Sequence, residues 1–392
     1  MKRFIICALL ALTAAVAAAE IEFDFKSSYD GSSQKAAGFV PDDLAADSTP
    51  RPLLLIAHFM GGNRYTAKNS GYYEAAAKRG WLVAAPELHG KNTDGKTSCA
   101  ALEAQHDIID AMNYMKENYP VDNTRIYIAG RSMGGQLTAM MLAKYPDVFA
   151  AGVAGQGCYD LTALNELADG VDINIRRELG DDPFEAERRS AANYAGNLAS
   201  VPIVMWHGTG DGLVAPAQSE RLFEAISEYQ KYARPVFYIA NSGHINQNVP
   251  AEWVCDQLIP YQMTSDAGLP TRWNPSLNIV TDEAKKFFYL DITPKDPGQF
   301  ARVECDLTGY FDRSPQLNGC KVKSGVAGMT IRTKNVAELG IDLDLIPAAV
   351  RPQEFKFERD SELPAKFFTV ADGKKTERPI ELSSHEPVRG DN

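Results

Sequence analysis

The feature that most constrains the fold of this chain is the alternation of short apolar segments with longer amphipathic segments from Glu20 to about Tyr261. The short segments are bounded by Gly or Pro and are partly rich in β-branched residues, which is typical of buried strands. Apolar strands that alternate with helices predict a mostly parallel sheet with helices on both faces. The predicted strands are Leu53–Ala57, Leu82–Ala85, Arg125–Ala129, Gly152–Ala154, Ile203–Trp206 and Val236–Ala240.

The longer segments between these strands have apolar residues at helical spacing. The predicted helices are Ala67–Arg79, Ala101–Asn118, Met133–Lys144 and Ala217–Tyr232. In a sheet that is covered by helices, ligands bind beyond the carboxyl ends of the parallel strands. The residues that directly follow the strands are therefore the ones in which we look for chemistry.

The helical pattern ends at about Trp273, and strand-like segments separated by turn sequences follow. This change predicts a small antiparallel β domain over residues 273–350. The charged segment 351–392 contains several prolines, and it either completes the β domain or extends from it as a tail. The strands predicted in this region are Lys286–Ile292, Gln299–Leu307, Gly328–Thr333 and Ala337–Leu343.

The first residues predict a secretory signal peptide. Lys2 and Arg3 precede an apolar run from Phe4 to Val16, and three alanines follow at 17–19. A positive start, a short apolar core and a small-residue end are typical of signal peptides, whereas a membrane anchor needs about 20 apolar residues. We therefore expect residues 1–19 to be removed and the protein to be secreted or periplasmic. No later segment reaches transmembrane length, so we expect no membrane insertion.

The charge balance bears on possible partners. The chain carries 40 basic and 51 acidic side chains and has a formal charge of −11. Nucleic acid binding needs a concentrated basic surface, and the sequence contains no basic cluster of that kind. We therefore expect no nucleic acid partner.

Five cysteines remain after the predicted signal peptide: Cys99, Cys158, Cys255, Cys305 and Cys320. An oxidising compartment permits disulfides, and Cys305 and Cys320 are close enough in sequence to bridge a hairpin. The other three are an odd number, so at least one thiol is expected to be unpaired. The sequence has no Cys-x-x-Cys pair and no zinc spacing, so neither a metal nor a cofactor is predicted.

The strongest motif is Gly130-Arg131-Ser132-Met133-Gly134-Gly135, which directly follows a predicted strand and directly precedes a predicted helix. A G-x-S-x-G sequence alone occurs often by chance, but a catalytic serine needs this strand-to-helix turn. The small residues permit a tight turn with close packing of strand and helix. The turn exposes the Ser132 hydroxyl at a helix N-terminus, where backbone N–H groups favour developing negative charge.

Two further strand ends carry the groups that a serine nucleophile needs. Asp211 follows the strand Ile203–Trp206, and His244 follows the strand Val236–Ala240. A serine hydroxyl needs a base, and the base needs a carboxylate that fixes its tautomer and stabilises its cation. The order Ser, Asp, His on three strand ends is the arrangement of the α/β-hydrolase fold. Asp160, which follows the strand near Gly155, is the alternative carboxylate.

The oxyanion hole needs two N–H groups that face the oxygen of the tetrahedral intermediate. Met133, directly after the nucleophile, supplies one of them. The loop His58-Phe59-Met60-Gly61-Gly62 follows the strand Leu53–Ala57, and Met60 is the predicted second donor with Phe59 as the alternative. His58 and His207 are expected to brace loops and not to act as bases.

The sequence from Asp122 to Gly135 resembles the prolyl-oligopeptidase-like and dienelactone-hydrolase-like branch of the α/β-hydrolase superfamily, as does Pro202 to Asp211 with Val214 and Pro216. The resemblance covers about residues 30–260. It implies an α/β-hydrolase catalytic domain at residues 20–265, with Ser132 as nucleophile, Asp211 as acid and His244 as base. True oligopeptidases carry a propeller before this domain, whereas only about 30 residues lie between the predicted signal peptide and Leu53 here.

The sequence therefore predicts an exported serine hydrolase that cleaves carboxylic esters through an acyl-enzyme. Exported members of this branch include feruloyl and acetyl esterases, so the substrate class is a small-molecule ester or one linked to polysaccharide. The alternatives are a peptidase with the same mechanism, or an inactive hydrolase scaffold that serves as a binding protein. The long connection between Gly157 and Ser200 forms either a pocket wall over Ser132 or a helical linker packed on the sheet.

Overall fold

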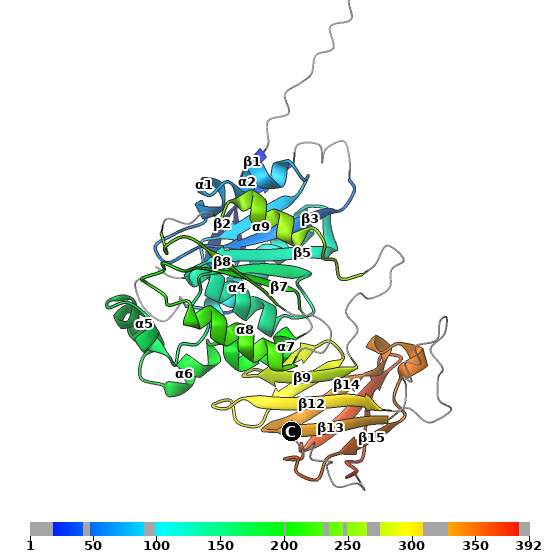
Figure 1. Cartoon of the computed structure of the whole chain (residues 1–392). Helices are drawn as coiled ribbons and strands as arrows, with labels where there is room; N and C mark the ends of the chain where they lie inside the picture. Colours follow the sequence, from blue (N-terminus) through cyan, green and yellow to red (C-terminus); the bar gives the residue numbers. More distant parts are fainter. Residues whose placement is uncertain are drawn as a thin grey trace, which may run out of the picture.

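The computed structural model describes residues 19–41, 48–89, 99–199, 201–229, 235–245, 249–264, 275–308 and 328–383. An eight-stranded sheet with helices on both faces is built from the first part of the chain, and two further sheets follow it (Figure 1). The predicted signal peptide, apart from Ala19, lies outside the described residues, as does Cys320. Within the described ranges, no helix combines the length and the apolar character needed to cross a membrane.

The large sheet has the strand order β1-β2-β4-β3-β5-β6-β7-β8. Strand β2 is antiparallel to both of its neighbours, and the strands from β4 to β8 are all parallel to one another. The strands are β1 Ala19–Lys26, β2 Ser33–Val40, β3 Arg51–Ala57, β4 Leu82–Pro86, β5 Val121–Arg131, β6 Ala151–Gly155, β7 Ile203–Gly208 and β8 Val236–Ala240. All six predicted strands are present, and the prediction of a mostly parallel sheet is confirmed.

The helices of this part are α1 Thr66–Asn69, α2 Tyr72–Ala77, α3 Leu102–Asn118, α4 Met133–Lys144, α5 Val171–Leu179, α6 Pro183–Arg188, α7 Ala195–Leu198, α8 Ala217–Tyr229 and α9 Ala251–Leu258. Short 3-10 turns occur at η2 Leu164–Glu166 and η3 Ala191–Tyr194. Apolar side chains of α3, α4 and α8 share one buried core with the sheet. Those of α1, α2 and α9 share a second core on the opposite face.

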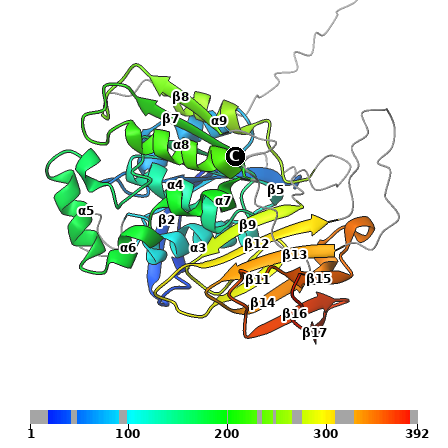
Figure 2. The ribbon, with the colours of Figure 1, turned by 60° about the horizontal axis from the view of Figure 1, so that its bottom comes forward.

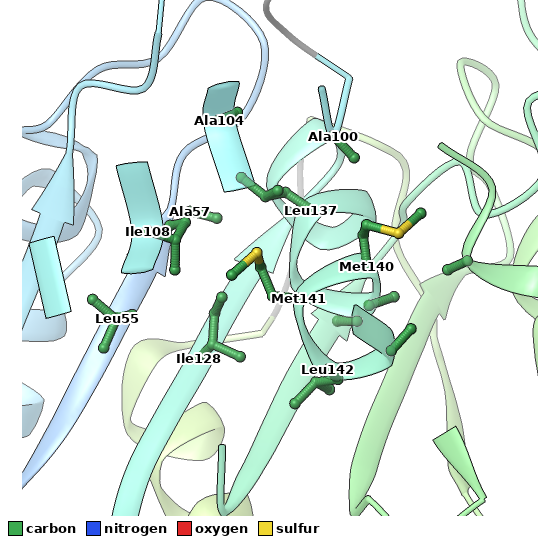
Figure 3. Close-up of a cluster of buried hydrophobic side chains, with 14 of the residues drawn as sticks. Leu55, Ala57, Ala100, Ala104, Ile108, Ile128, Leu137, Met140, Met141 and Leu142 are labelled. Atoms are coloured by element: carbon green, nitrogen blue, oxygen red, sulfur yellow. The ribbon is translucent and has the colours of Figure 1, made fainter. Parts of the chain in front are cut away.

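Strand β3 shows why both faces are covered. Leu53, Leu55 and Ala57 contribute to the core under α3 and α4, whereas Leu54 and Ile56 contribute to the core on the other face. Successive strand residues point to opposite faces, so a continuously apolar strand needs cover on both sides. Figure 3 shows Leu55 and Ala57 on the first face, close to side chains of α3 and α4.

Parts of this sheet region differ from the sequence prediction, and helices α5, α6, α7 and α9 are not among the predicted helices. Strands β1 and β2 were not predicted, although Ile21, Phe23 and Phe25 alternate with charged residues as in a half-buried strand. The single helix predicted over Ala67–Arg79 is wrong, because the chain forms the two short helices α1 and α2 there. Gly71 separates them with a φ of 80°, a conformation that cannot continue a right-handed helix.

The C-terminal strands form a sandwich of two sheets, which lie one over the other in Figure 2. The sheet orders are β15-β13-β12-β9 and β10-β11-β14-β16-β17, and apolar residues from both sheets share one core. Most neighbouring strands are antiparallel, as predicted, but β13 pairs with β15 and β14 with β16 in parallel. The strands are β9 Ser276–Thr281, β10 Lys285–Phe287, β11 Leu290–Pro294, β12 Ala301–Thr308, β13 Gly328–Lys334, β14 Val336–Asp342, β15 Glu354–Phe357, β16 Lys366–Ala371 and β17 Lys374–Glu377.

The C-terminal segment supplies part of this sandwich. Strand β15 belongs to one sheet, and β16 and β17 belong to the other, so residues 354–377 contribute to both layers. The predicted single strand Lys286–Ile292 is a hairpin of β10 and β11 instead, because the chain turns at Phe288 with a φ of 54°. The thiol of Cys305 is buried in the sandwich, 3.5 Å from the Tyr289 hydroxyl. Its pairing with Cys320 stays a prediction.

Candidate active site

The turn between β5 and α4 presents Ser132 at the carboxyl edge of the sheet. Ser132 has φ 56° and ψ −128°, which is a strained conformation for a residue with a side chain. Its backbone N–H donates to the carbonyl oxygen of Gly155 over 2.8 Å and fixes the turn. A Cβ atom on Gly134 would lie 2.1 Å from the carbonyl oxygen of Ala57. The glycine therefore lets α4 start directly against β3.

Three side chains from three strand ends form a continuous hydrogen-bonded chain. His244 Nε2 lies 2.9 Å from Ser132 Oγ, and His244 Nδ1 lies 2.6 Å from Asp211 Oδ2. A carboxylate accepts hydrogen bonds, so Nδ1 of the neutral ring carries the proton and Nε2 can accept the proton of the serine hydroxyl. The structure thus brings Ser132, His244 and Asp211 together in the order that the sequence predicts.

Asp211 is held by several donors. Its Oδ1 accepts the backbone N–H groups of Leu213 and Val214, each over 2.9 Å, and its Oδ2 accepts from Gln156 Nε2 over 2.9 Å. Burial by itself raises the pKa of Asp211. The hydrogen bonds from two histidine rings and from the two backbone groups outweigh burial and hold this pKa well below its usual range. The surroundings of Asp211 therefore favour its ionised form.

The second of these histidines, His207, is fully buried beside Asp211. Its Nε2 lies 2.9 Å from the carbonyl oxygen of Val214 and 3.2 Å from Asp211 Oδ2, and its Nδ1 lies 2.7 Å from Ser219 Oγ. A carbonyl oxygen only accepts, so Nε2 carries a proton and Nδ1 accepts from the serine hydroxyl. The loop of residues 209–214 after β7 carries Asp211 and is called the acid loop. His207 braces this loop, as the sequence suggested, and it also faces the carboxylate of Asp211 directly.

Gln156 is a site residue that the sequence reasoning missed. It lies directly after β6 with a φ of 47°, and its Nε2 also lies 3.2 Å from the carbonyl oxygen of Gly243. The side chain therefore links the acid loop to the loop that carries His244. A glutamine gives no chemical signal in a sequence, and its position directly after a parallel strand is the one feature that could have identified it.

Asp160, the alternative carboxylate, faces other groups. Its Oδ1 accepts from the hydroxyl of Thr162, and its Oδ2 lies 3.4 Å from the guanidinium of Arg221. The carboxylate next to His244 is Asp211.

The residues predicted for the oxyanion hole lie around Ser132. Met133 is the first residue of α4, so its N–H has no acceptor within the helix. Met60 lies in the turn after β3, which is closed by a hydrogen bond from Gly62 N–H to the carbonyl oxygen of Phe59 over 2.8 Å. Met60, Met133 and Phe59 all line the cavity beside Ser132. His58 braces this loop through the carbonyl oxygens of Phe59 and Glu87.

A cavity of about 500 Å³ opens next to Ser132 and His244. Most of the side chains around it are apolar, so the cavity suits an uncharged organic group. Arg131 forms part of the rim, where its guanidinium lies 4.3 Å above the Phe59 ring, and burial lowers its pKa. The other lining residues are Phe59, Met60, Cys99, Met133, Gln136, Cys158, Val171, Ile175, Leu213, Val214 and Ile245.

Helix α5 forms one wall of this cavity. Val171 and Ile175 are four residues apart on one helix face, and both line the cavity. The chain before α5 is fixed to the acid loop by a β-bridge between Leu167 and Val214, and Ala168 N–H donates to the carbonyl oxygen of Leu213 over 2.9 Å. The long connection after β6 thus contains a pocket wall, which was one of its two predicted roles.

Part of this chain is similar to known hydrolases. A model of the prolyl oligopeptidase family matches residues 69–256. An acetylxylan esterase of Coprinopsis cinerea is 33% identical over 183 residues, which cover 41% of this chain and 46% of that protein. Feruloyl esterase B of Talaromyces funiculosus is 27% identical over 204 residues, which cover 49% and 56%. The chain thus spans about half the length of the curated relatives it matches.

Among solved structures, a puromycin-hydrolyzing peptidase of Mycobacterium tuberculosis has a TM-score of 0.51 to this chain at 21% identity. The similarity covers 62% of this chain and 38% of that protein. It shows that the first part of the chain has the α/β-hydrolase fold, which the additional β sheets follow. The match to the prolyl oligopeptidase family agrees with the resemblance that the sequence shows over this part of the chain.

Proposed function

We propose that this protein is an exported serine hydrolase that cleaves carboxylic esters through an acyl-enzyme. The observation that carries the proposal is the hydrogen-bonded chain from Ser132 through His244 to Asp211, with distances of 2.9 and 2.6 Å, at the edge of an apolar cavity. Nucleophile, base and orienting carboxylate are the three groups that acyl transfer to a serine needs.

The reaction begins when Ser132 Oγ attacks the ester carbonyl carbon and His244 Nε2 takes the hydroxyl proton. The imidazolium that forms is stabilised by the carboxylate of Asp211. The N–H groups of Met60 and Met133 donate to the oxyanion of the tetrahedral intermediate. His244 then returns the proton to the leaving alcohol, and the acyl group stays on Ser132. Water repeats the sequence in the second half-reaction, releases the acid and restores the serine.

We infer an ester on a carbohydrate as the substrate class. The named activities of the two curated relatives, acetylxylan esterase and feruloyl esterase, support this inference. The apolar lining of the cavity supports a role in holding the acyl group, because a sugar would need polar partners there. Both relatives match only part of the chain, so a panel of acetylated and feruloylated sugars is the direct measurement of specificity.

A serine peptidase is the second candidate, and the match to the prolyl oligopeptidase family favours it. Amide hydrolysis needs protonation of a much poorer leaving group than ester hydrolysis does. We expect p-nitrophenyl esters to be cleaved at least about a hundredfold faster than the matched peptide anilides. Equal or faster cleavage of the anilides assigns the protein to the peptidases instead.

Fluorophosphonate labelling tests the catalytic assignment. We expect the probe to modify Ser132 of the folded protein, and the modified serine is identified by peptide mapping. Ser132→Ala should lower kcat for p-nitrophenyl acetate by about four to six orders of magnitude without changing the thermal unfolding temperature by more than a few degrees. A folded protein that is not labelled at Ser132 and cleaves no ester supports the alternative of an inactive binding scaffold.

Export is part of the proposal and rests on the sequence from Lys2 to Ala19. Expression of the full chain in a bacterial host, followed by N-terminal sequencing of the product, tests it. Cleavage before Glu20 and recovery outside the cytoplasm are the expected results. An unprocessed cytoplasmic product contradicts export but leaves the proposed chemistry in place.

A further inference from the structure

A buried group of charges joins the β sandwich to the hydrolase part of the chain. The carboxylate of Asp282, directly after β9, is fully buried. It lies 2.7 Å from the ammonium of Lys144, 2.7 and 2.8 Å from two guanidinium nitrogens of Arg188, and 3.0 Å from the hydroxyl of Tyr194. Glu283 also lies 2.7 Å from Lys144. The carboxylate of Asp282 therefore contacts three separate segments of the hydrolase part, namely α4, α6 and η3.

These segments belong to the surroundings of the active site. Lys144 is the last residue of α4, whose first turn follows Ser132. Arg188 is the last residue of α6, and only three residues separate α6 from the pocket-wall helix α5. The connection is short and structured, because Asp182 accepts the Phe184 N–H over 2.9 Å and caps α6. A displacement of α6 must therefore move the end of α5.

Further contacts join the β sandwich to α6, η3 and α7. The ring of Phe300, before β12, lies 5.1 Å from the Phe184 ring of α6 and 5.4 Å from the Tyr194 ring. Asn197 of α7 exchanges two hydrogen bonds of 2.8 and 2.9 Å with the backbone of Val280 in β9. In Figure 1 β9 and β12 lie on the side of the molecule where α6 and α7 are found. The sandwich thus contacts α6 through a charge, an aromatic ring and the neighbouring backbone.

The wall helix α5 is therefore anchored on both sides. Before α5, the bridge between Leu167 and Val214 attaches it to the acid loop. After α5, the pair of Arg188 and Asp282 attaches α6 to the sandwich. An ion pair with a fully buried carboxylate and a two-pronged guanidinium has a defined geometry, unlike an exposed ion pair.

We propose that the β sandwich holds the α5–α6 wall of the acyl cavity in place, with Asp282 as the positioning residue and Arg188 as its partner. The sandwich then determines which acyl groups fit. The inference rests on the proposed ester hydrolysis for its kinetic readout only. Val171 and Ile175 line the same cavity as Ser132, so we expect a large acyl group to depend on this wall more than an acetyl group does.

Arg188→Met is the decisive variant, because it removes the charged link between Asp282 and α6 but leaves Lys144 paired with Asp282 and the Phe300–Phe184 ring contact in place. We expect KM for a feruloyl ester to rise about tenfold, and kcat/KM for p-nitrophenyl acetate to stay within about twofold of the wild type. Arg188→Lys keeps a cation without the two-pronged geometry and should restore part of the loss. Arg332→Met is the matched control, because Arg332 pairs with carboxylates elsewhere in the sandwich.

Hydrogen–deuterium exchange of residues 171–179 gives a readout that does not depend on activity. We expect exchange there to become at least about fivefold faster in Arg188→Met, and also in Phe300→Ala, which weakens the same contact from the sandwich side. Arg332→Met should leave it unchanged. If Arg188→Met does not fold, Arg188→Lys and Phe300→Ala provide the same comparison.

Two results overturn the proposal: unchanged exchange in α5, or an equal loss of activity on the feruloyl and the acetyl ester. A faster exchange in α5 together with the selective loss on the large ester supports it. If the wild-type protein cleaves no ester at all, the proposed function fails, and the exchange measurement still decides whether the sandwich holds the wall.

Discussion

Asp211 is a buried carboxylate whose charge is maintained by its neighbours. Its two oxygens accept from backbone N–H groups, from Gln156 and from two histidine rings. Each of these donors favours the ionised form and also fixes the plane of the carboxylate. Because His244 Nδ1 is held by this carboxylate, the orientation of the base depends in part on Gln156 and His207, which do not line the cavity.

Gln156→Leu tests this dependence at the level of one side chain. Leucine has a similar volume but removes the donor to Asp211 and to the carbonyl oxygen of Gly243. We expect kcat for p-nitrophenyl acetate to fall about tenfold with KM unchanged, because the loss of one hydrogen bond to a charged group costs about 1.5 kcal/mol.

Steady-state kinetics measure the effect, and thermal unfolding shows whether the variant is folded. Gln299→Leu, a change at an exposed residue of the sandwich, is the control. An unchanged kcat in a folded Gln156→Leu protein would show that the other donors suffice.

At the same scale, the sequence located Ser132, Asp211 and His244 because each follows a recognisable strand and the three occur in a known order. It did not locate Gln156, whose role depends on a left-handed backbone conformation and on two loops that converge. A reactive side chain can be recognised in a sequence by its residue type. A side chain that only supports others through hydrogen bonds is recognised once the structure shows its partners.

The strand-to-helix turn at Ser132 makes a prediction at the scale of an element. In Gly134→Ala the new Cβ would lie 2.1 Å from the carbonyl oxygen and 2.8 Å from the carbonyl carbon of Ala57. These are backbone atoms of a central strand, so α4 has to move away from β3. We expect a loss of about 3 kcal/mol in the free energy of unfolding, together with a large loss of kcat.

Urea unfolding of Gly134→Ala and of Gly298→Ala measures this effect. A Cβ on Gly298 meets only the flexible side chain of Asp296 at 3.3 Å, so this control should be close to neutral. Equal stability of the two variants would mean that α4 is less tightly seated on the sheet than these distances imply.

Helix α5 makes a prediction about the cavity. Ile175→Trp places a large ring into the space beside Ser132, because Ile175 is buried and lines the cavity. We expect kcat/KM for a feruloyl ester to fall at least about tenfold, and kcat/KM for p-nitrophenyl acetate to change less than about threefold.

The control is Ile173→Trp on the same helix. Ile173 is 55% exposed and should tolerate the larger ring without an effect on either ester. Equal effects on both esters in Ile175→Trp would show that α5 does not select the acyl group.

The elements themselves were predictable to different degrees. The parallel strands came from continuous apolar runs, which a sheet with two covered faces requires. The break at Gly71 was not predicted, because a single glycine is compatible with a helix until its φ is known. The bounds of α5 and α6 were not predicted, although a helical linker was one interpretation of this connection. Both helices are short, and α6 is held by Asp282, a residue 94 positions beyond Arg188. Local pattern carries no information about such a partner.

At the scale of the whole molecule, Asp282 links folding to pH. Burial raises the pKa of this carboxyl, but Lys144 and Arg188 outweigh burial and lower it to about 2. The unfolded chain has a pKa of about 3.9 at this residue. The folded pKa is the lower one, so the stabilisation is complete above about pH 4 and is lost as the pH falls toward 2.

Asp282→Asn removes this contribution. We expect the variant to be about 3 kcal/mol less stable than the wild type at pH 7, because two cations lose their buried partner. The difference should shrink as the pH falls from 4 toward 2, where the wild-type carboxyl becomes protonated.

Chemical unfolding of both proteins at pH 7, 4, 3 and 2.5 measures the difference at each pH. Other carboxyl groups titrate in both proteins and cancel in that difference. A gap that stays constant down to pH 2.5 would show that the charge of Asp282 does not contribute to stability.

The sequence predicted a β region after the hydrolase part, since turn sequences separate strand-like segments from residue 273 onward. It did not predict that this region contacts α6 and α4. Asp and Lys are exposed in most proteins, so the sequence gives no reason to expect that Asp282 and Lys144 are buried together. The relation between the two parts is set by a few side chains that are far apart in the chain.

The bridge between Leu167 and Val214 has a consequence for large ligands. Val214 also donates its N–H to Asp211, so this one residue is hydrogen-bonded to the carboxylate that holds His244 and is bridged to the segment that leads into α5. We expect a ligand that displaces α5 outward to strain the hydrogen bonds of Asp211, and with them the position of the His244 ring. Size discrimination then shows up as slow turnover of bound molecules, even for those that enter the site readily.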